Sequence, residues 1–209
     1  MNKICFILFL FSTLIHGQDL KKMDGQYQAK PSCDHENKIP KLSNEQREET
    51  KKILSKKCQS KNGEACLALG MLYIFDEKNE KLGINNFQKS CSLGEKDGCF
   101  HLALKLKKKE KKKSIDLLTT NCKLGHIKSC RRAAEMNQEE KNSQEAINLY
   151  QLACKKEDLK SCYKLAMLEK NLTQRLLSLK LNCEKGHQLS CRVNAVLERK
   201  FDGVQDEKL

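Results

Sequence analysis

From Ile147 to Ala166 the chain reads INLYQLACKKEDLKSCYKLA. Ile147, Tyr150 and Cys154 are spaced at i, i+3 and i+7, as residues on one face of a helix are. The polar letters KKED then favour a turn, and a second helical face begins at Cys162. The stretch therefore predicts one unit made of a helix, a short turn and a second helix.

The same unit is repeated along the chain. Five pairs of cysteines are each separated by seven residues. The pairs are Cys58 and Cys66, Cys91 and Cys99, Cys122 and Cys130, Cys154 and Cys162, and Cys183 and Cys191. The first cysteines of successive pairs are 33, 31, 32 and 29 residues apart. A period of this length indicates one unit that is copied and stacked, so the sequence predicts an all-α solenoid of about five helical hairpins.

Other positions of the repeat agree with this prediction. Four residues before the first cysteine the side chain is always large and apolar: Leu54, Phe87, Leu118, Tyr150 and Leu179. Seven residues before it the side chain is apolar except in the first repeat: Lys51, Ile84, Ile115, Ile147 and Leu176. Four residues after the second cysteine the residue is always small: Gly70, Ala103, Ala134, Ala166 and Ala195. Small residues there would let the second helix of a hairpin approach its neighbour's backbone closely.

The helix ends also carry signals. Three residues after the first cysteine, Gly94, Gly125 and Gly186 can take a positive φ and end the first helix of a hairpin. The segment that begins at Ser43 predicts a capping box for the first helix. Ser143 is expected to cap the first helix of the fourth hairpin.

The N-terminus has the features of a secretory signal. Lys3 precedes an apolar run from Ile4 to Ile15 that is too short to span a membrane. We expect cleavage after Gly17, with an uncleaved short anchor as the alternative. The mature protein is then expected to be secreted or periplasmic and to contain no transmembrane segment.

The whole chain is expected to have four segments. They are a signal peptide at residues 1–17, a polar disordered leader at 18–42, the repeat array at 43–200 and a polar tail at 201–209.

Export favours disulfide bonds within the five pairs. The first cysteine ends one helix and the second begins the next, so the two side chains come within bonding distance across the turn. Metal binding is the alternative, but zinc sites favour cysteines two to four residues apart with histidine partners. We therefore expect no metal site and no cofactor. Cys33 lies outside the pairs, as a free thiol or as one half of an intermolecular bridge.

The composition bears on the kind of partner. The formal net charge is +13, tryptophan is absent and aromatic residues make up 5% of the chain. Scarce aromatics and the absence of a nucleic-acid-binding motif argue against nucleic acid as the partner of an exported protein. A protein, a peptide or an anionic envelope polymer is expected instead. The segment Lys105–Lys113 carries seven lysines and is interpreted either as a solvated helix end or as a basic patch.

The hairpin motif resembles the SEL-like repeats, which are related to tetratricopeptide repeats. The resemblance rests on Leu149–Cys154, on Ser161–Ala166 and on cysteines seven residues apart across each turn. Within that superfamily the chain resembles the Helicobacter cysteine-rich proteins, which are secreted or periplasmic and carry a β-lactamase or penicillin-binding label. The resemblance therefore implies β-lactam binding or hydrolysis, with a β-lactam or a peptidoglycan fragment as ligand. The repeats here are shorter than is usual for the family, so a binding groove is not carried over.

The residues themselves do not assemble into a catalytic site, and the catalytic residues are unknown. Ser161 and Lys164 have the spacing of the nucleophile and lysine of serine β-lactamases, but the Ser-Asp-Asn and Lys-Thr-Gly elements are absent. His101, His126 and His187 are scattered along the array, and the last two share a turn position two repeats apart. We therefore favour an exported interaction scaffold. A β-lactam-binding or β-lactam-hydrolysing enzyme, and a stability module within a larger complex, are the alternatives.

Overall fold

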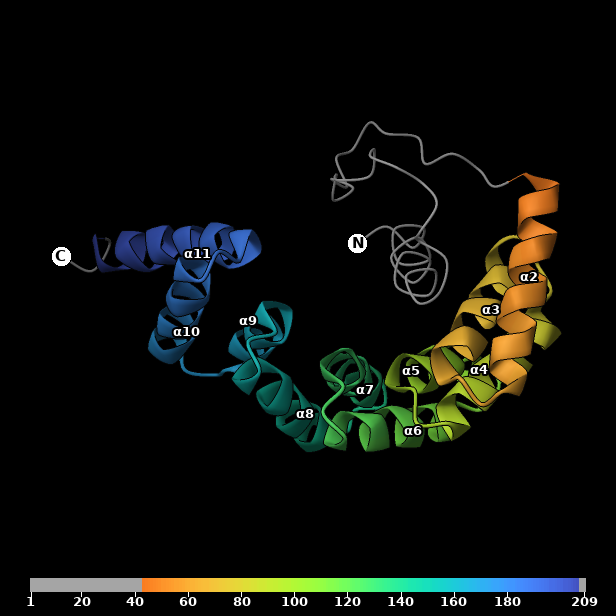
Figure 1. Cartoon of the computed structure of the whole chain (residues 1–209). Helices are drawn as coiled ribbons and strands as arrows, with labels where there is room; N and C mark the ends of the chain where they lie inside the picture. Colours follow the sequence, from red (N-terminus) through yellow and green to blue (C-terminus); the bar gives the residue numbers. More distant parts are fainter. Residues whose placement is uncertain (1–42, 207–209) are drawn as a thin grey trace. The chain divides into compact units, whose positions relative to one another are not determined.

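The computed structural model describes residues 43–206, with side chains described up to Arg199. Every regular element in this part of the chain is an α-helix, and it contains no strand (Figure 1). The helices are α2 (Asn44–Gln59), α3 (Gly63–Phe75), α4 (Glu80–Ser92), α5 (Lys96–Leu106), α6 (Lys111–Lys123), α7 (Ile127–Glu139), α8 (Ser143–Lys155), α9 (Leu159–Leu168), α10 (Leu172–Glu184) and α11 (Gln188–Asp206). No helix between residues 43 and 206 is long and apolar enough to cross a membrane.

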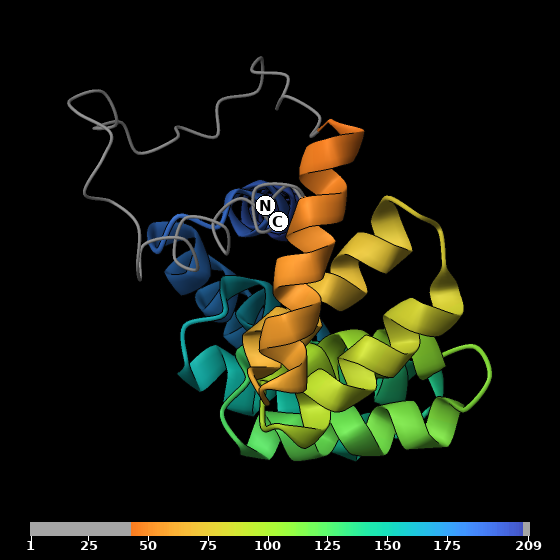
Figure 2. The ribbon, with the colours of Figure 1, turned by 45° about the vertical axis from the view of Figure 1, so that its right-hand side comes forward.

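The chain forms two compact units, which are described separately. Among the described residues, unit 1 comprises 43–102 and unit 2 comprises 103–206, with the boundary inside α5. In each unit, helices that follow one another in the sequence pack against each other and run back and forth (Figures 1 and 2). The hairpins are α2–α3, α4–α5, α6–α7, α8–α9 and α10–α11. The expected all-α fold of helical hairpins is confirmed.

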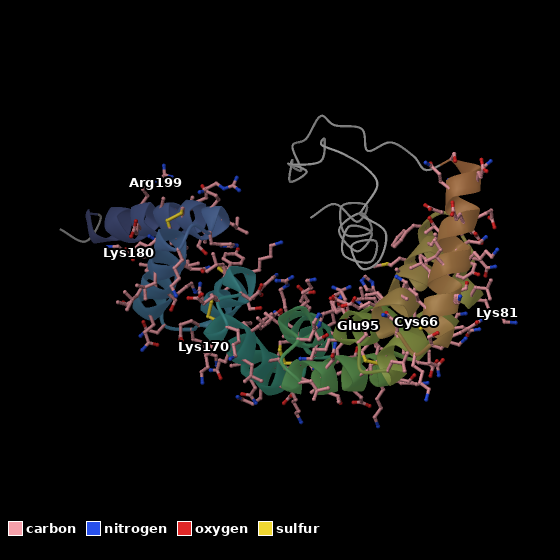
Figure 3. The ribbon with its side chains drawn as sticks, in the orientation of Figure 1. Cys66, Lys81, Glu95, Lys170, Lys180 and Arg199 are labelled. Carbon is pink, nitrogen blue, oxygen red and sulfur yellow. A yellow bond between two sulfur atoms is a disulfide. The ribbon has the colours of Figure 1, made fainter. Side chains whose placement is uncertain are left out.

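Each hairpin is closed by one disulfide bond. The bonds join Cys58 to Cys66, Cys91 to Cys99, Cys122 to Cys130, Cys154 to Cys162 and Cys183 to Cys191 (yellow in Figure 3). The Cα atoms of a pair lie 4.4 to 4.7 Å apart. All cysteines between residues 43 and 206 are in these bonds, whereas Cys33 and the expected signal and leader segments lie outside the described residues. Closing a loop of about nine residues stabilises a hairpin by about 2.5 kcal/mol through the entropy of the unfolded chain.

The turn inside each hairpin contains a residue in the left-handed conformation. Gly94, Gly125 and Gly186 have φ values of 85°, 89° and 93°. At the same position of the other two hairpins stand Lys61 and Glu157, with φ values of 64° and 63°. A side chain in this region costs about 1–2 kcal/mol, so these two turns are formed against a local penalty.

The core follows the repeat. The five side chains that stand four residues before the first cysteine are all at most 5% exposed: Leu54, Phe87, Leu118, Tyr150 and Leu179. The side chains seven residues before it, from Lys51 to Leu176, are half-buried in all five hairpins. Each hairpin therefore buries one large side chain, and the side chain three residues before it in the same helix is half-buried.

Small residues set the distance between hairpins. A Cβ atom added to Gly70 would lie 2.6 Å from the ring of Phe87 and 3.1 Å from the carbonyl oxygen of Gly83, so α3 and α4 touch through their backbones. In unit 2 the Ser114 hydroxyl of α6 donates to the carbonyl oxygen of Ala103 in α5 at 2.6 Å. The expected column of small residues is buried in the first four hairpins. Ala195 in the last one is exposed, because no described helix packs on that face of α11.

Two helix starts can be compared with their predictions. The capping box at Ser43 is present: its hydroxyl accepts from the Gln46 N–H, and the Gln46 side chain accepts from the Ser43 N–H. The cap predicted at Ser143 is wrong. Asn142 holds that position, and its carbonyl accepts the first helical hydrogen bond, from the Ala146 N–H at 3.1 Å. The reason is the reversal at Lys141, whose φ of 63° lets the helix begin one residue earlier.

The last helix runs further than the expected array. α11 continues to Asp206, so part of the segment expected as a polar tail extends this helix.

Candidate interaction surface

The Ser161–Lys164 pair is part of a helix start. Ser161 is fully buried. Its hydroxyl donates to Asp158 Oδ2 at 2.6 Å, and its N–H donates to the same oxygen at 3.1 Å. Lys164 is exposed on α9. The serine hydroxyl is therefore occupied by the cap of α9 and is closed to solvent.

Asp158 also joins two hairpins of unit 2. Its Oδ1 lies 2.5 Å from Nη1 of Arg131, which follows the second cysteine of the preceding hairpin. The aspartate side chain is 16% exposed and the arginine 25%, so water screens the pair only in part. One carboxylate thus caps α9 and binds α7.

His126 begins α7 within a small polar network. The Asn121 amide donates to the Ser129 hydroxyl at 2.8 Å, and that hydroxyl lies 2.7 Å from Nδ1 of His126. The Asn121 amide nitrogen also lies 3.3 Å from Nδ1, so the three side chains are held together at the start of α7.

His187 repeats this arrangement at the start of α11. Its Nδ1 accepts from the Ser190 N–H at 3.2 Å and lies 2.8 Å from the Ser190 hydroxyl. The hydroxyl in turn accepts from the amide of Asn182 at 2.8 Å. The ring lies 5.5 Å from that of Tyr163 in the preceding hairpin. Burial lowers the pKa of His187, nearby Lys160 lowers it further, and Asp158 opposes both.

The three histidines expected to be scattered are held in separate places. His101 lies in unit 1, with its ring centroid 5.4 Å from those of Phe87 and Phe100. His126 and His187 lie in separate hairpins of unit 2. Between residues 43 and 206 no three His, Cys, Asp or Glu side chains are grouped as a metal site.

Sequence reasoning missed a polar position that links hairpins. In two hairpins the residue directly before the first cysteine donates to a carbonyl in the first turn of the preceding hairpin's second helix. Ser90 Oγ donates to Gly63 O at 2.8 Å in unit 1, and Asn182 Nδ2 donates to Leu159 O at 2.9 Å in unit 2. Both donors are at most 3% exposed. Polar residues beside three of the five first cysteines were the available signal.

The lysine run is partly neutralised. Lys107 pairs with Glu139 at 2.9 Å, Lys111 pairs with Glu140, and Lys113 pairs with Glu110 at 2.9 Å. The Glu140 hydrogen bond raises the pKa of Lys111. Two lysines of the run, Lys107 and Lys111, therefore bind the end of α7, whereas the Lys113–Glu110 pair is local to the start of α6.

Charge is distributed very unevenly between the two units. Residues 43–102 carry 10 Lys and Arg against 9 Asp and Glu, a net charge of +1. Residues 103–206 carry 23 against 13, a net charge of +10. The excess positive charge of the described chain thus belongs to unit 2.

Comparison with known proteins identifies the fold. No protein-family model and no curated protein matches the sequence. A Sel1 repeat protein from Oxalobacter formigenes superposes with a TM-score of 0.59 at 14% identity, over 69% of this chain and 66% of that one. A protective antigen of uropathogenic Escherichia coli strains that displays an SLR fold superposes with a TM-score of 0.58 at 16% identity, over 67% of this chain and 34% of that one. This chain thus spans about a third of the antigen and just under two thirds of the Sel1 repeat protein. The stacked, disulfide-closed helical hairpins have the SEL-like repeat fold.

Proposed function

We propose that this protein is an exported scaffold that binds another protein or a peptide through the outer faces of its hairpins. The observation that carries the proposal is the row of disulfide-closed hairpins with the fold of Sel1 repeat proteins. Stacked repeats of this kind present extended surfaces that suit a macromolecular partner.

The five disulfide bonds support a location outside the cytoplasm, since such bonds persist in oxidising compartments. The internal roles of Ser161, Asp158, His126 and His187 also favour a scaffold. Each of these polar groups is bound to its own fold, so the outer faces are left for recognition.

The test begins with location and redox state. Cells that express the full chain are fractionated, and thiols are alkylated before reduction. We expect the protein in the envelope or the medium, with the ten paired cysteines protected. A cytoplasmic protein with reactive cysteines would refute the proposal.

Binding is then measured with the purified oxidised protein as bait in envelope extract. The same bait after reduction and alkylation is the matched control, because it has the same amino-acid sequence without the disulfide bonds. We expect a defined partner on the oxidised bait alone. Nitrocefin is assayed in parallel, since hydrolysis well above the buffer rate that is lost on reduction would favour the β-lactamase alternative instead.

A further inference from the structure

At two exposed positions of the repeat, leucine appears in the last two hairpins where the other hairpins have polar residues. The two positions lie six and two residues before the first cysteine, and all ten side chains there are exposed. The earlier position holds Lys52, Asn85, Asp116, Asn148 and Leu177. The later position holds Lys56, Lys89, Thr120, Leu152 and Leu181. Leucine therefore replaces polar residues only in α8 and α10.

These leucines are not needed for packing. Leu152, Leu177 and Leu181 are 48%, 59% and 52% exposed. The other hairpins form the same helices with polar residues at these positions, so the fold does not require apolar side chains there. Leu177 and Leu181 are four residues apart on α10 and form one continuous patch on its surface. Single exposed leucines are ordinary, but a cluster at positions that are otherwise polar indicates a contact.

Lysines lie on the same helix faces. Lys155 stands three residues after Leu152, and Lys180 stands three residues after Leu177 (Figure 3). Lys185 stands four residues after Leu181. All three are exposed, and no ion pair within the described residues joins them to an acid. The surface of α10 thus combines an apolar strip with two unpaired lysines and one exposed acid, Glu184, which stands three residues after Leu181.

We propose that the leucine–lysine face of α10, formed by Leu177, Leu181, Lys180 and Lys185, binds an acidic amphipathic helix of a protein partner. The inference rests on the proposed scaffold function and names the chemistry of its partner. Apolar side chains of the partner at i and i+4 match the spacing of Leu177 and Leu181. Flanking Asp and Glu of the partner match the lysines.

The charge of unit 2 favours this occupant over a second copy of the chain. A net charge of +10 on each copy would oppose association of two such faces. An anionic membrane is also less suitable, because two leucines on one helix bury little apolar area in a bilayer.

The test uses a fluorescent 18-residue helical peptide, with leucines at i, i+3, i+4 and i+7 and glutamates elsewhere, and the oxidised full chain. Anisotropy is measured at low and high salt. We expect saturable binding that weakens with salt, and no binding of the same peptide with lysine in place of glutamate. Equal binding of both peptides would overturn the proposal.

The decisive variant combines Leu177→Asn and Leu181→Thr, which copy the residues of Asn148 and Thr120 in other hairpins. We expect about a tenfold or greater loss of peptide affinity with unchanged thermal unfolding. Ile53→Asn is the matched control, because Ile53 is 49% exposed on α2 of unit 1 and should leave affinity unchanged.

Three further results would overturn the proposal. They are unchanged affinity in the double variant, loss of a dimer in sedimentation on the same substitutions, and binding to vesicles of phosphatidylglycerol without peptide binding. Failure of this face is distinguishable from failure of the scaffold. If the double variant still captures the partners of the unmodified bait, only the face is wrong, whereas an unmodified bait that captures nothing refutes the scaffold itself.

Discussion

The first hairpin of unit 1 and the last hairpins of unit 2 are closed by the same kind of disulfide bond but bury different amounts of their helices, whereas α7 and α8 of unit 2 still bury six and four residues. In α3 of unit 1 every residue from Ala65 to Leu72 is buried. In α9 of unit 2 only Ser161 and Ala166 are buried, and in α10 only Leu179 and Asn182. Unit 1 is nearly neutral while unit 2 carries a net charge of +10. A disulfide bond and one large buried side chain therefore keep a hairpin formed even where few other residues are buried and the surface is highly charged, as in the last hairpin.

The largest expected effect tests the difference in core. Phe87→Ala in unit 1 removes a ring that is 1% exposed and packs on Gly70, and it should cost about 4 kcal/mol of unfolding free energy. Leu179→Ala changes the same repeat position in unit 2 and should cost about 2–3 kcal/mol, because the removed side chain is smaller and α9 and α10 bury few other residues. Denaturant unfolding followed by circular dichroism measures both. Leu177→Ala, on the exposed face of α10, is the control and should change little. An equal loss in the two units would contradict the comparison.

Removing one disulfide bond tests how far the stability of each unit depends on that bond. Alanine at both Cys58 and Cys66, or at both Cys183 and Cys191, removes the same loop constraint of about 2.5 kcal/mol. We expect the consequences to differ, because α3 retains its buried face whereas α10 and α11 retain little. Hydrogen exchange should show lost protection throughout α10 and α11 in the second variant. It should show only faster exchange near the turn in the first, and the reverse pattern would refute the argument.

Asp158 tests the contact between hairpins within unit 2. Asp158→Ala loses the cap of α9 and the pair with Arg131, and should cost about 1–2 kcal/mol. Asp158→Asn keeps a capping side chain without the charge and should lose about half as much. Asp116→Ala on the exposed face of α6 is the matched control and should be nearly neutral. Thermal unfolding separates the three variants. An asparagine form that melts with the unmodified chain would show that the ion pair contributes nothing, and equal melting temperatures for the alanine and asparagine forms would show that the cap contributes nothing.

The parts of the fold that could be predicted depend on repetition. The cysteine spacing predicted the hairpins, the column from Leu54 to Leu179 predicted the large buried side chains, and Gly125 predicted a left-handed turn. Each of these signals recurs in several repeats, so a single departure such as Lys51 does not hide it. Because the repeats can be aligned with one another, one sequence shows which positions keep the same kind of residue.

The parts that could not be predicted are local choices between polar groups. Glu157 adopts a glycine-like φ because the disulfide and the packing on both sides fix the turn, which outweighs its own preference. Asn182 and Ser129 are polar residue types that are usually exposed, but both are buried here. Only their hydrogen bonds in the folded protein show that their role is structural. Ser143 failed as a cap because the position of the preceding reversal decides which residue leads a helix.

The smallest expected effect concerns pH. The pKa of His187 is lowered in the folded protein, chiefly by burial. The unfolded chain then binds protons more readily than the folded one, so stability is greatest above the unfolded pKa of about 6.5 and falls as pH decreases through the folded value. The physical reason is that burial and the nearby charge of Lys160 disfavour the protonated ring, which Asp158 offsets only in part. Hydrogen exchange of α11 between pH 8 and 5, corrected for intrinsic rates, should show this loss of protection.

The first hairpin suggests a variant that tests whether His187 causes this pH dependence. At the same turn position Asn62 caps α3 by accepting from the Ala65 N–H at 2.8 Å, and an amide does not titrate in this range. His187→Asn should therefore keep the cap of α11 and flatten its pH profile, so that the last hairpin behaves like the first. An unchanged slope in this variant would assign the pH dependence to another group. A profile that was already flat in the unmodified chain would show that Tyr163 and Ser190 hold the ring equally well in both charge states.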